Sequence, residues 1–140
     1  MTQARRHTFS ARKLAVLLAL VAASGCSLAT DVNSPGLLAP ISNLNQTAPT
    51  NTALAAPLQV LVASQFGERL RNQTVTWTIT AGGGTLSVTG GGSSTTTITS
   101  LTDDSGIAEM NYTTGATAGT SSIQARVGEV PPITFTVTIT

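Results

Sequence analysis

The sequence predicts an all-β fold, a sandwich or barrel built from short antiparallel strands. Three observations support this: strict alternation of apolar and polar residues, glycine-rich turns between the alternating stretches, and 19 threonines among residues 74–140. A strand with one buried and one solvated face requires a period of two residues. Short strands separated by turns every 8 to 12 residues or so are typical of sandwiches and barrels. No stretch beyond residue 25 keeps the 3.6-residue period of a helix.

Two stretches alternate over their whole length, TVTWTIT at 74–80 and ITFTVTIT at 133–140. Further inward-facing sets are expected at 58–62, 108–112 and 123–127. Trp77 shares the parity of its apolar neighbours, which favours a place in the core over an exposed sugar-stacking platform. The predicted core includes Val75, Trp77, Ile79, Met110, Tyr112 and Phe135.

The turns between these strands contain residues that could suggest ligand sites. The glycine triplets at 82–84 and 90–92 neither precede a helix nor lead into Lys-Ser/Thr, so they indicate hairpin loops rather than phosphate cradles. Asp103-Asp104-Ser105-Gly106 offers oxygen atoms, but it lacks the ligand order of a calcium loop and is typical of a tight turn. We therefore predict no metal site.

The first 25 residues have the layout of a secretion signal. Four basic residues precede the apolar run LAVLLALVAA at 14–23, and small residues follow. Ten residues span about 15 Å as a helix, roughly half of a bilayer core, so a permanent transmembrane helix is disfavoured. We predict export by a Sec-type signal. A twin-arginine signal is the alternative, but residues 8–9 are out of register with that motif.

The single cysteine, Cys26, follows Ser24 and Gly25 directly and closes the apolar run. This arrangement resembles the lipobox of bacterial lipoproteins, although Ala23 stands where leucine is usual. The resemblance implies cleavage between Gly25 and Cys26, after which Cys26 carries acyl chains such as palmitate. Ser27 implies, by the same resemblance, export to the outer membrane of the cell envelope. Two or more acyl chains make membrane anchoring stable. The alternative is ordinary cleavage that leaves Cys26 a spectator thiol.

Removal of the signal changes the charge of the chain. The whole chain carries +1, but residues 26–140 keep three arginines against six acidic residues, a formal charge of −3. His7 and Lys13 are the only histidine and lysine, and both lie in the signal. With no basic stripe, we expect no nucleic-acid binding. With no histidine, lysine or metal-ligand cluster, we expect neither an enzyme nor a cofactor.

Residues 26–56 are rich in proline, asparagine, threonine, serine and alanine, with no persistent apolar period. We predict that they form a flexible tether between a lipid anchor and the domain. The alternative for their last part is a first edge strand that starts near Asn45. The domain itself is then expected at 57–140.

Residues 57–140 also resemble a known family. The stretches LQVLV at 58–62, Val75-Thr76-Trp77 and TDDSGIA at 102–108 are similar to motifs of the group 1 bacterial immunoglobulin-like domain, the invasin/intimin-like kind. Glu68-Arg69 and Asn72 depart from the usual turn residues before residue 74. The resemblance implies an immunoglobulin-like sandwich of about seven antiparallel strands. Its motifs specify a fold and hardly any activity.

Together these features predict a cell-envelope lipoprotein that displays one immunoglobulin-like domain as a structural or protein-interaction module. The alternative is an adhesin or carbohydrate-binding module that uses the loops at 66–72 and 90–94. The expected partners are the membrane, through the lipid anchor, and an unidentified protein or glycan. The candidate contact residues of these two loops are Phe66, Glu68, Arg69, Arg71, Gly91 and Ser93.

Overall fold

A computed structural model describes residues 32–92 and 94–140. The signal, the cleavage point at Gly25 and the lipidation residue Cys26 therefore lie outside the described residues, as does Ser93. The described part contains nine strands: β1 (Pro35–Pro40), β2 (Asn45–Ala48), β3 (Leu58–Ser64), β4 (Thr74–Ala81), β5 (Gly84–Ser87), β6 (Thr97–Leu101), β7 (Ile107–Thr114), β8 (Gly119–Arg126) and β9 (Ile133–Ile139).

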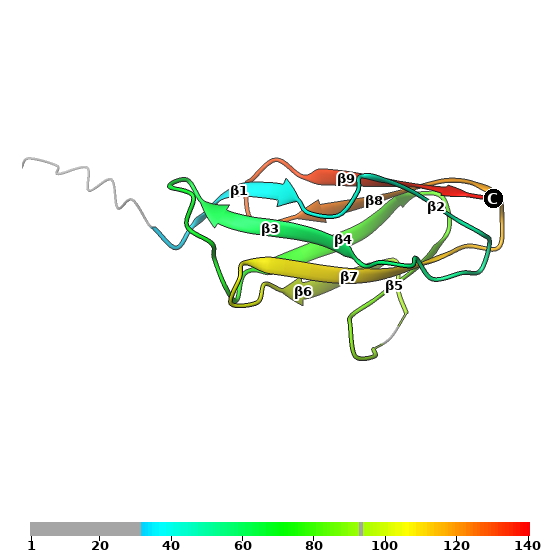
Figure 1. Cartoon of the computed structure of the whole chain (residues 1–140), viewed down its shortest axis with the longest axis horizontal. Coiled ribbons are helices and arrows are strands. Elements are labelled where there is room, and N and C mark those ends of the chain that lie inside the picture. Colours follow the sequence, from blue (N-terminus) through cyan, green and yellow to red (C-terminus); the bar gives the residue numbers. More distant parts are fainter. Residues whose placement is uncertain (1–31, 93) are drawn as a thin grey trace, which may run out of the picture.

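The nine strands form a sandwich of two sheets, and the prediction of an all-β fold is confirmed (Figure 1). One sheet has the order β1-β3-β7-β5, and the other has the order β2-β9-β8-β4-β6. Within residues 32–92 and 94–140 there is no helix, and so none that could cross a membrane.

The first strand lies inside the stretch for which the sequence predicts a tether. β1 pairs antiparallel with β3, and its Leu38 is buried at 7% exposure. Proline usually indicates a loop, yet Pro35 and Pro40 are the first and last residues of an edge strand. There a missing N–H costs no ladder hydrogen bond. The prediction of a flexible tether over 26–56 therefore does not hold for this segment, and the domain begins before residue 57.

The second strand, β2, starts at Asn45, where the sequence allows an edge strand. It lies at the edge of the five-stranded sheet and runs parallel to β9, with Asn45 opposite Thr136. The chain thus leaves β1 in one sheet and enters β2 in the other within five residues. This division of the N-terminal segment between both sheets adds strands beyond the expected seven, and it makes one pair parallel.

The core fills the space between the two sheets. Val75, Trp77, Met110 and Tyr112 have no exposed surface, and Phe135 has 1%. Ile79, the sixth residue of the predicted core, is only partly buried and packs against the edge of this cluster. It lies beside an irregularity in the sheet, where the register of β4 against β8 shifts between Ile79 and Ala81.

Trp77 joins four strands of the five-stranded sheet. Its ring stacks on that of Phe135 in β9, with centroids 6.0 Å apart and an interplanar angle of 28°. Its indole N–H donates to Ser100 Oγ in β6 at 2.9 Å, so the buried indole nitrogen has a hydrogen-bond partner. Trp77 also lies opposite Ala125 of β8 in the register.

We expect Trp77→Ala to lower the free energy of unfolding by about 3–5 kcal/mol, because it leaves a large cavity between the sheets. Urea denaturation followed by circular dichroism measures this loss. Phe66→Ala, which truncates an aromatic ring that is 61% exposed, is the matched control and should change stability little. Equal effects of the two substitutions would contradict the assignment of the core.

We expect a fragment of residues 57–140 to unfold at a much lower temperature than a fragment of residues 32–140. The shorter fragment lacks β1 and β2, which exposes the edges of β3 and β9 and the core beneath Leu38. Thermal melts of the two fragments test this. Equal melting temperatures would mean that the first two strands add nothing to the domain.

Candidate functional site

The sandwich has two distinct ends, defined by the loops that meet there. At the entry end, where the chain enters β1, lie the loops 65–73, 102–106 and 127–132. Pro35 pairs with Ser64 at this end, and Thr74 pairs with Leu101. At the far end lie the loops 49–57, 82–83 and 115–118, together with the end of β9 (Figure 1).

The predicted contact loop that contains Phe66 belongs to the entry end and is held in one conformation by Ser64. The Ser64 hydroxyl accepts from the N–H groups of Phe66 and Glu68, at 3.2 and 3.3 Å, and it is itself buried. Gly67 has φ +85°, a conformation that favours glycine, and its N–H donates to Ser64 O. This turn leaves the Phe66 side chain 61% exposed.

The charged residues of the same loop reach the neighbouring 102–106 loop. Arg71 forms an ion pair with Asp104 at 3.4 Å, and Arg69 donates to Ser105 O at 3.4 Å. Both partners of the ion pair are largely exposed, so the pair adds little to stability. Glu68 is exposed as well.

Asp103 serves the backbone of its own turn. Its Oδ1 accepts from the N–H groups of Ser105 at 2.8 Å and Ile107 at 2.9 Å, the arrangement of an aspartate that stabilises a turn. Beside it, the buried Thr102 hydroxyl donates to Leu70 O at 2.6 Å and accepts from Gln73 N at 2.9 Å. Thr102 therefore binds the two loops of the entry end to each other.

The second predicted contact loop lies elsewhere. Residues 88–96 leave the four-stranded sheet after Ser87, which pairs with Asn111 in the middle of β7, and enter β6 in the other sheet. Gly91 is exposed at φ +101°, and its N–H donates to Val88 O at 3.3 Å. The structure therefore does not bring the loops at 66–72 and 90–94 together at one end of the sandwich.

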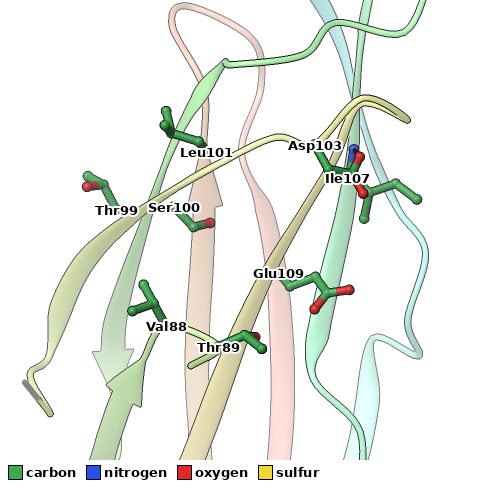
Figure 2. A pocket seen from close by; sticks show the side chains of 8 residues that line it. All are labelled: Val88, Thr89, Thr99, Ser100, Leu101, Asp103, Ile107 and Glu109. Carbon is green, nitrogen blue, oxygen red and sulfur yellow. Dashed lines mark hydrogen bonds between the residues drawn. The ribbon is translucent and has the colours of Figure 1, made fainter. Parts of the chain in front are cut away.

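A groove along one side of the sandwich runs from the start of the 88–96 loop to the 102–106 loop, with Val88 and Thr89 at one end and Leu101 and Asp103 at the other (Figure 2). We call it the edge groove. It has a volume of about 530 Å³. Its walls come from β6, β7, the 102–106 loop and the start of the 88–96 loop: Val88, Thr89, Thr99, Ser100, Leu101, Asp103, Ile107 and Glu109.

Both strands that border the edge groove have an open backbone edge. β5 covers only residues 111–114 of β7, so the Ile107–Met110 half pairs with β3 alone in the described part of the chain. β6 is the edge strand of its sheet, and its even-numbered neighbours Thr96 and Thr102 bond towards β4. By the alternation of a ladder, Thr97, Thr99 and Leu101 turn their N–H and C=O groups outward.

The sequence did not indicate the edge groove, because its residues come from three segments that a local pattern cannot bring together. Leu101 is 61% exposed, but the sequence does not distinguish it from Ile98, the other apolar residue of the threonine-rich stretch 95–102, which packs against the core.

At the far end, one backbone carbonyl ties the two sheets together. Gly83 O accepts from the Tyr112 hydroxyl of β7 and from Ser121 Oγ of β8, the latter at 2.8 Å. A hollow of about 290 Å³ opens beside it, lined by the 82–83 and 115–120 segments and Ile139. The residues that line this hollow are glycines, alanines, threonines and one isoleucine, and none of them is charged.

Among residues 32–92 and 94–140, no three His, Cys, Asp or Glu side chains gather as a metal site would require. Three of the five carboxylates found there, those of Asp103, Asp104 and Glu109, have structural partners. Glu109 accepts from Gln59 Nε2 at 2.7 Å across the β3–β7 pair, in addition to the turn and ion-pair contacts of Asp103 and Asp104.

Comparisons with known proteins place the fold. No protein-family model matches the chain, and no curated protein does. Among solved structures, domains 4 and 5 of the S-layer protein SbsC align with a TM-score of 0.51 at 16% identity, over 75% of this chain and 51% of that one. Domains 5–6 of the same protein align with a TM-score of 0.53 at 16% identity, over 76% and 44%.

A D0-D1 structure of intimin aligns at 28% identity with a TM-score of 0.46, over 73% of this chain and 47% of that one. The chain thus spans about half the length of these S-layer and intimin chains. The fold is an immunoglobulin-like β-sandwich.

We expect Tyr112→Phe and Ser121→Ala each to lower the free energy of unfolding by about 1 kcal/mol, the net value of one hydrogen bond. The double variant should lose more than the sum, because Gly83 O then has no hydroxyl donor. A double-mutant cycle from urea denaturation measures the difference. Strict additivity would contradict the shared role of this carbonyl.

Proposed function

We propose that this protein is a lipoprotein of the bacterial cell envelope, anchored in the outer membrane, that displays one immunoglobulin-like sandwich as a structural or protein-interaction module. One observation carries the proposal: β1 begins at Pro35, nine residues after the lipobox-like cysteine. Acyl chains on Cys26 would therefore be joined almost directly to a folded sandwich. With so short a connection, a partner would have to bind the surface of the sandwich rather than a long linker.

The anchoring part of the proposal rests on the apolar run at 14–23 and the small residues before Cys26. Each acyl methylene buried in the bilayer contributes about 0.8 kcal/mol, so several chains hold a small domain stably. Ser27 supports sorting to the outer membrane through its resemblance to lipoproteins.

The role is proposed as physical rather than catalytic, on the contacts that the charged groups make. Asp103 is engaged by two backbone N–H groups of its turn, Arg71 pairs with Asp104, and Glu109 accepts from Gln59. These contacts stabilise loops and strand pairs. Asp103 and Glu109 both line the edge groove, but each is engaged by these structural contacts.

For partner contact, the edge groove is the surface that we favour. An extended segment of a partner protein can add to the outward edge of β6, where Thr97, Thr99 and Leu101 present backbone groups. Its side chains would then lie against Val88 and Leu101. Main-chain hydrogen bonds supply affinity in this mode, and the groove supplies selectivity.

The alternative, an adhesin or carbohydrate binder that uses the loops at 66–72 and 90–94, needs both loops on one surface. Their separation along the sandwich favours the interaction module. Phe66, the exposed aromatic ring of these loops, belongs to the entry end, away from the second loop.

We expect cells that express the full chain to incorporate radioactive palmitate into it, and Cys26→Ala to abolish the label and release the protein from membranes. The measurement is autoradiography of fractionated cells. Ser27→Asp serves as the matched control. It should keep the label, and by resemblance to other lipoproteins it should move the protein from the outer to the inner membrane fraction.

Membrane retention of Cys26→Ala equal to that of the parent chain would overturn the lipid anchor. Labelled protein that stays in the inner membrane fraction with Ser27 in place would instead overturn only the outer-membrane assignment.

A further inference from the structure

We infer that the entry end of the sandwich rests on the headgroup region of the membrane that holds Cys26, with Phe66 as its point of contact. This inference rests on the proposed lipid anchor and adds an orientation to it. Three features carry it: the short connection to Cys26, the distribution of charge over the domain, and the way Phe66 is presented.

The connection limits how far the entry end can move from the bilayer. Whatever path the intervening residues take, the nine residues from Cys26 to Pro35 span at most about 30 Å. A random coil of that length would average only about 15–18 Å. Pro35 pairs with Ser64, at the base of the Phe66 turn, so that base lies only about one strand spacing, roughly 5 Å, beyond this limit.

The charged side chains gather at this end. Residues 32–140 contain eight charged residues, and seven of them lie in or next to the entry-end loops. The eighth, Glu109, is within β7, and the far-end loops 49–57, 82–83 and 115–118 have none. The seven are Glu68, Arg69, Arg71, Asp103, Asp104, Arg126 and Glu129.

Charges of both signs complement a surface of zwitterionic headgroups, which carry phosphate and ammonium groups side by side. Arginine suits the phosphate oxygens because its guanidinium donates to two of them at once. With three arginines and four acids, the entry end has no net attraction to anionic lipid. Its contact therefore depends on the anchor and on apolar insertion rather than on a basic patch.

Phe66 provides the apolar group. Its side chain is 61% exposed at the tip of a turn that Ser64 holds through two hydrogen bonds, so the ring is presented to the outside rather than folded onto the core. An exposed aromatic ring at the tip of a turn is suited to the boundary between headgroups and acyl chains. On this orientation the far end points away from the membrane, and the edge groove stands along the side of the domain.

The test uses the full lipidated chain in phosphatidylcholine vesicles that contain a spin-labelled lipid quencher. Acylated Cys26 has no free thiol, so a second cysteine can be labelled selectively with a fluorophore. The label is placed at Gln65→Cys, beside Phe66, or at the exposed Ala116→Cys in a far-end loop as the matched control. Each is measured with Phe66 intact and with Phe66→Ser.

We expect the lipid quencher to reduce emission at position 65 by about two-fold or more, with little change at position 116. Phe66→Ser should remove most of the quenching at position 65 while the protein still floats with the vesicles. Because Phe66 is exposed, this variant should keep the circular dichroism spectrum of the parent chain.

Equal quenching by the lipid quencher at positions 65 and 116, in protein that floats with the vesicles, would overturn the orientation. It would not contradict the lipid anchor. Quenching at position 65 that Phe66→Ser does not change would overturn the contact assigned to that ring. A chain with intact Cys26 that fails to float would overturn the proposed function, and the orientation with it.

Discussion

The turn from β4 to β5 is the constraint on which much of this sandwich depends. Within Gly82–Gly84 the chain must leave the five-stranded sheet and join the other. The backbone passes so close to β7 and β8 that side chains do not fit: a Cβ on Gly82 would lie 2.7 Å from Ser121 Cα, and one on Gly84 2.7 Å from Tyr112 Cε2. The hydroxyls of Tyr112 and Ser121 then converge on Gly83 O, so one carbonyl links both sheets.

This crossing also explains the open side of the domain. Because β5 starts opposite Thr114 and lasts four residues, it ends opposite Asn111 and leaves the first half of β7 without a second neighbour. The chain then returns to the other sheet as β6, whose outer edge is also unpaired. The edge groove is the space between these two incomplete edges. Its position thus follows from a tight turn at the far end of the sandwich.

The central strands were predictable because burial imposes alternation on them. The inward sets of β3, β4, β7, β8 and β9 follow from a period of two, and in these strands nearly every inward residue is buried. β1 and β2 have mostly exposed residues and owe their conformation to pairing with β3 and β9, partners 20 residues or more away in the chain. A local pattern does not contain that information. The same limit hid the edge groove and the link that Thr102 makes between two loops.

Threonine accounts for the uneven charge of the molecule. Its β-branched side chain suits strands, and its hydroxyl tolerates solvent. The outward faces of β4 and β9 can therefore face solvent without any charged residue. Charge is then needed only where loops must stay solvated, and in the described chain every charged residue except Glu109 lies in or next to an entry-end loop. The far-end loops 82–83 and 115–118 consist of glycine, alanine and threonine, and the 49–57 loop is uncharged as well. The strands between the two ends need almost no charged residues, so the charged side chains gather at the entry end and the far end is uncharged. The domain is therefore polar along its long axis, although its net charge is small.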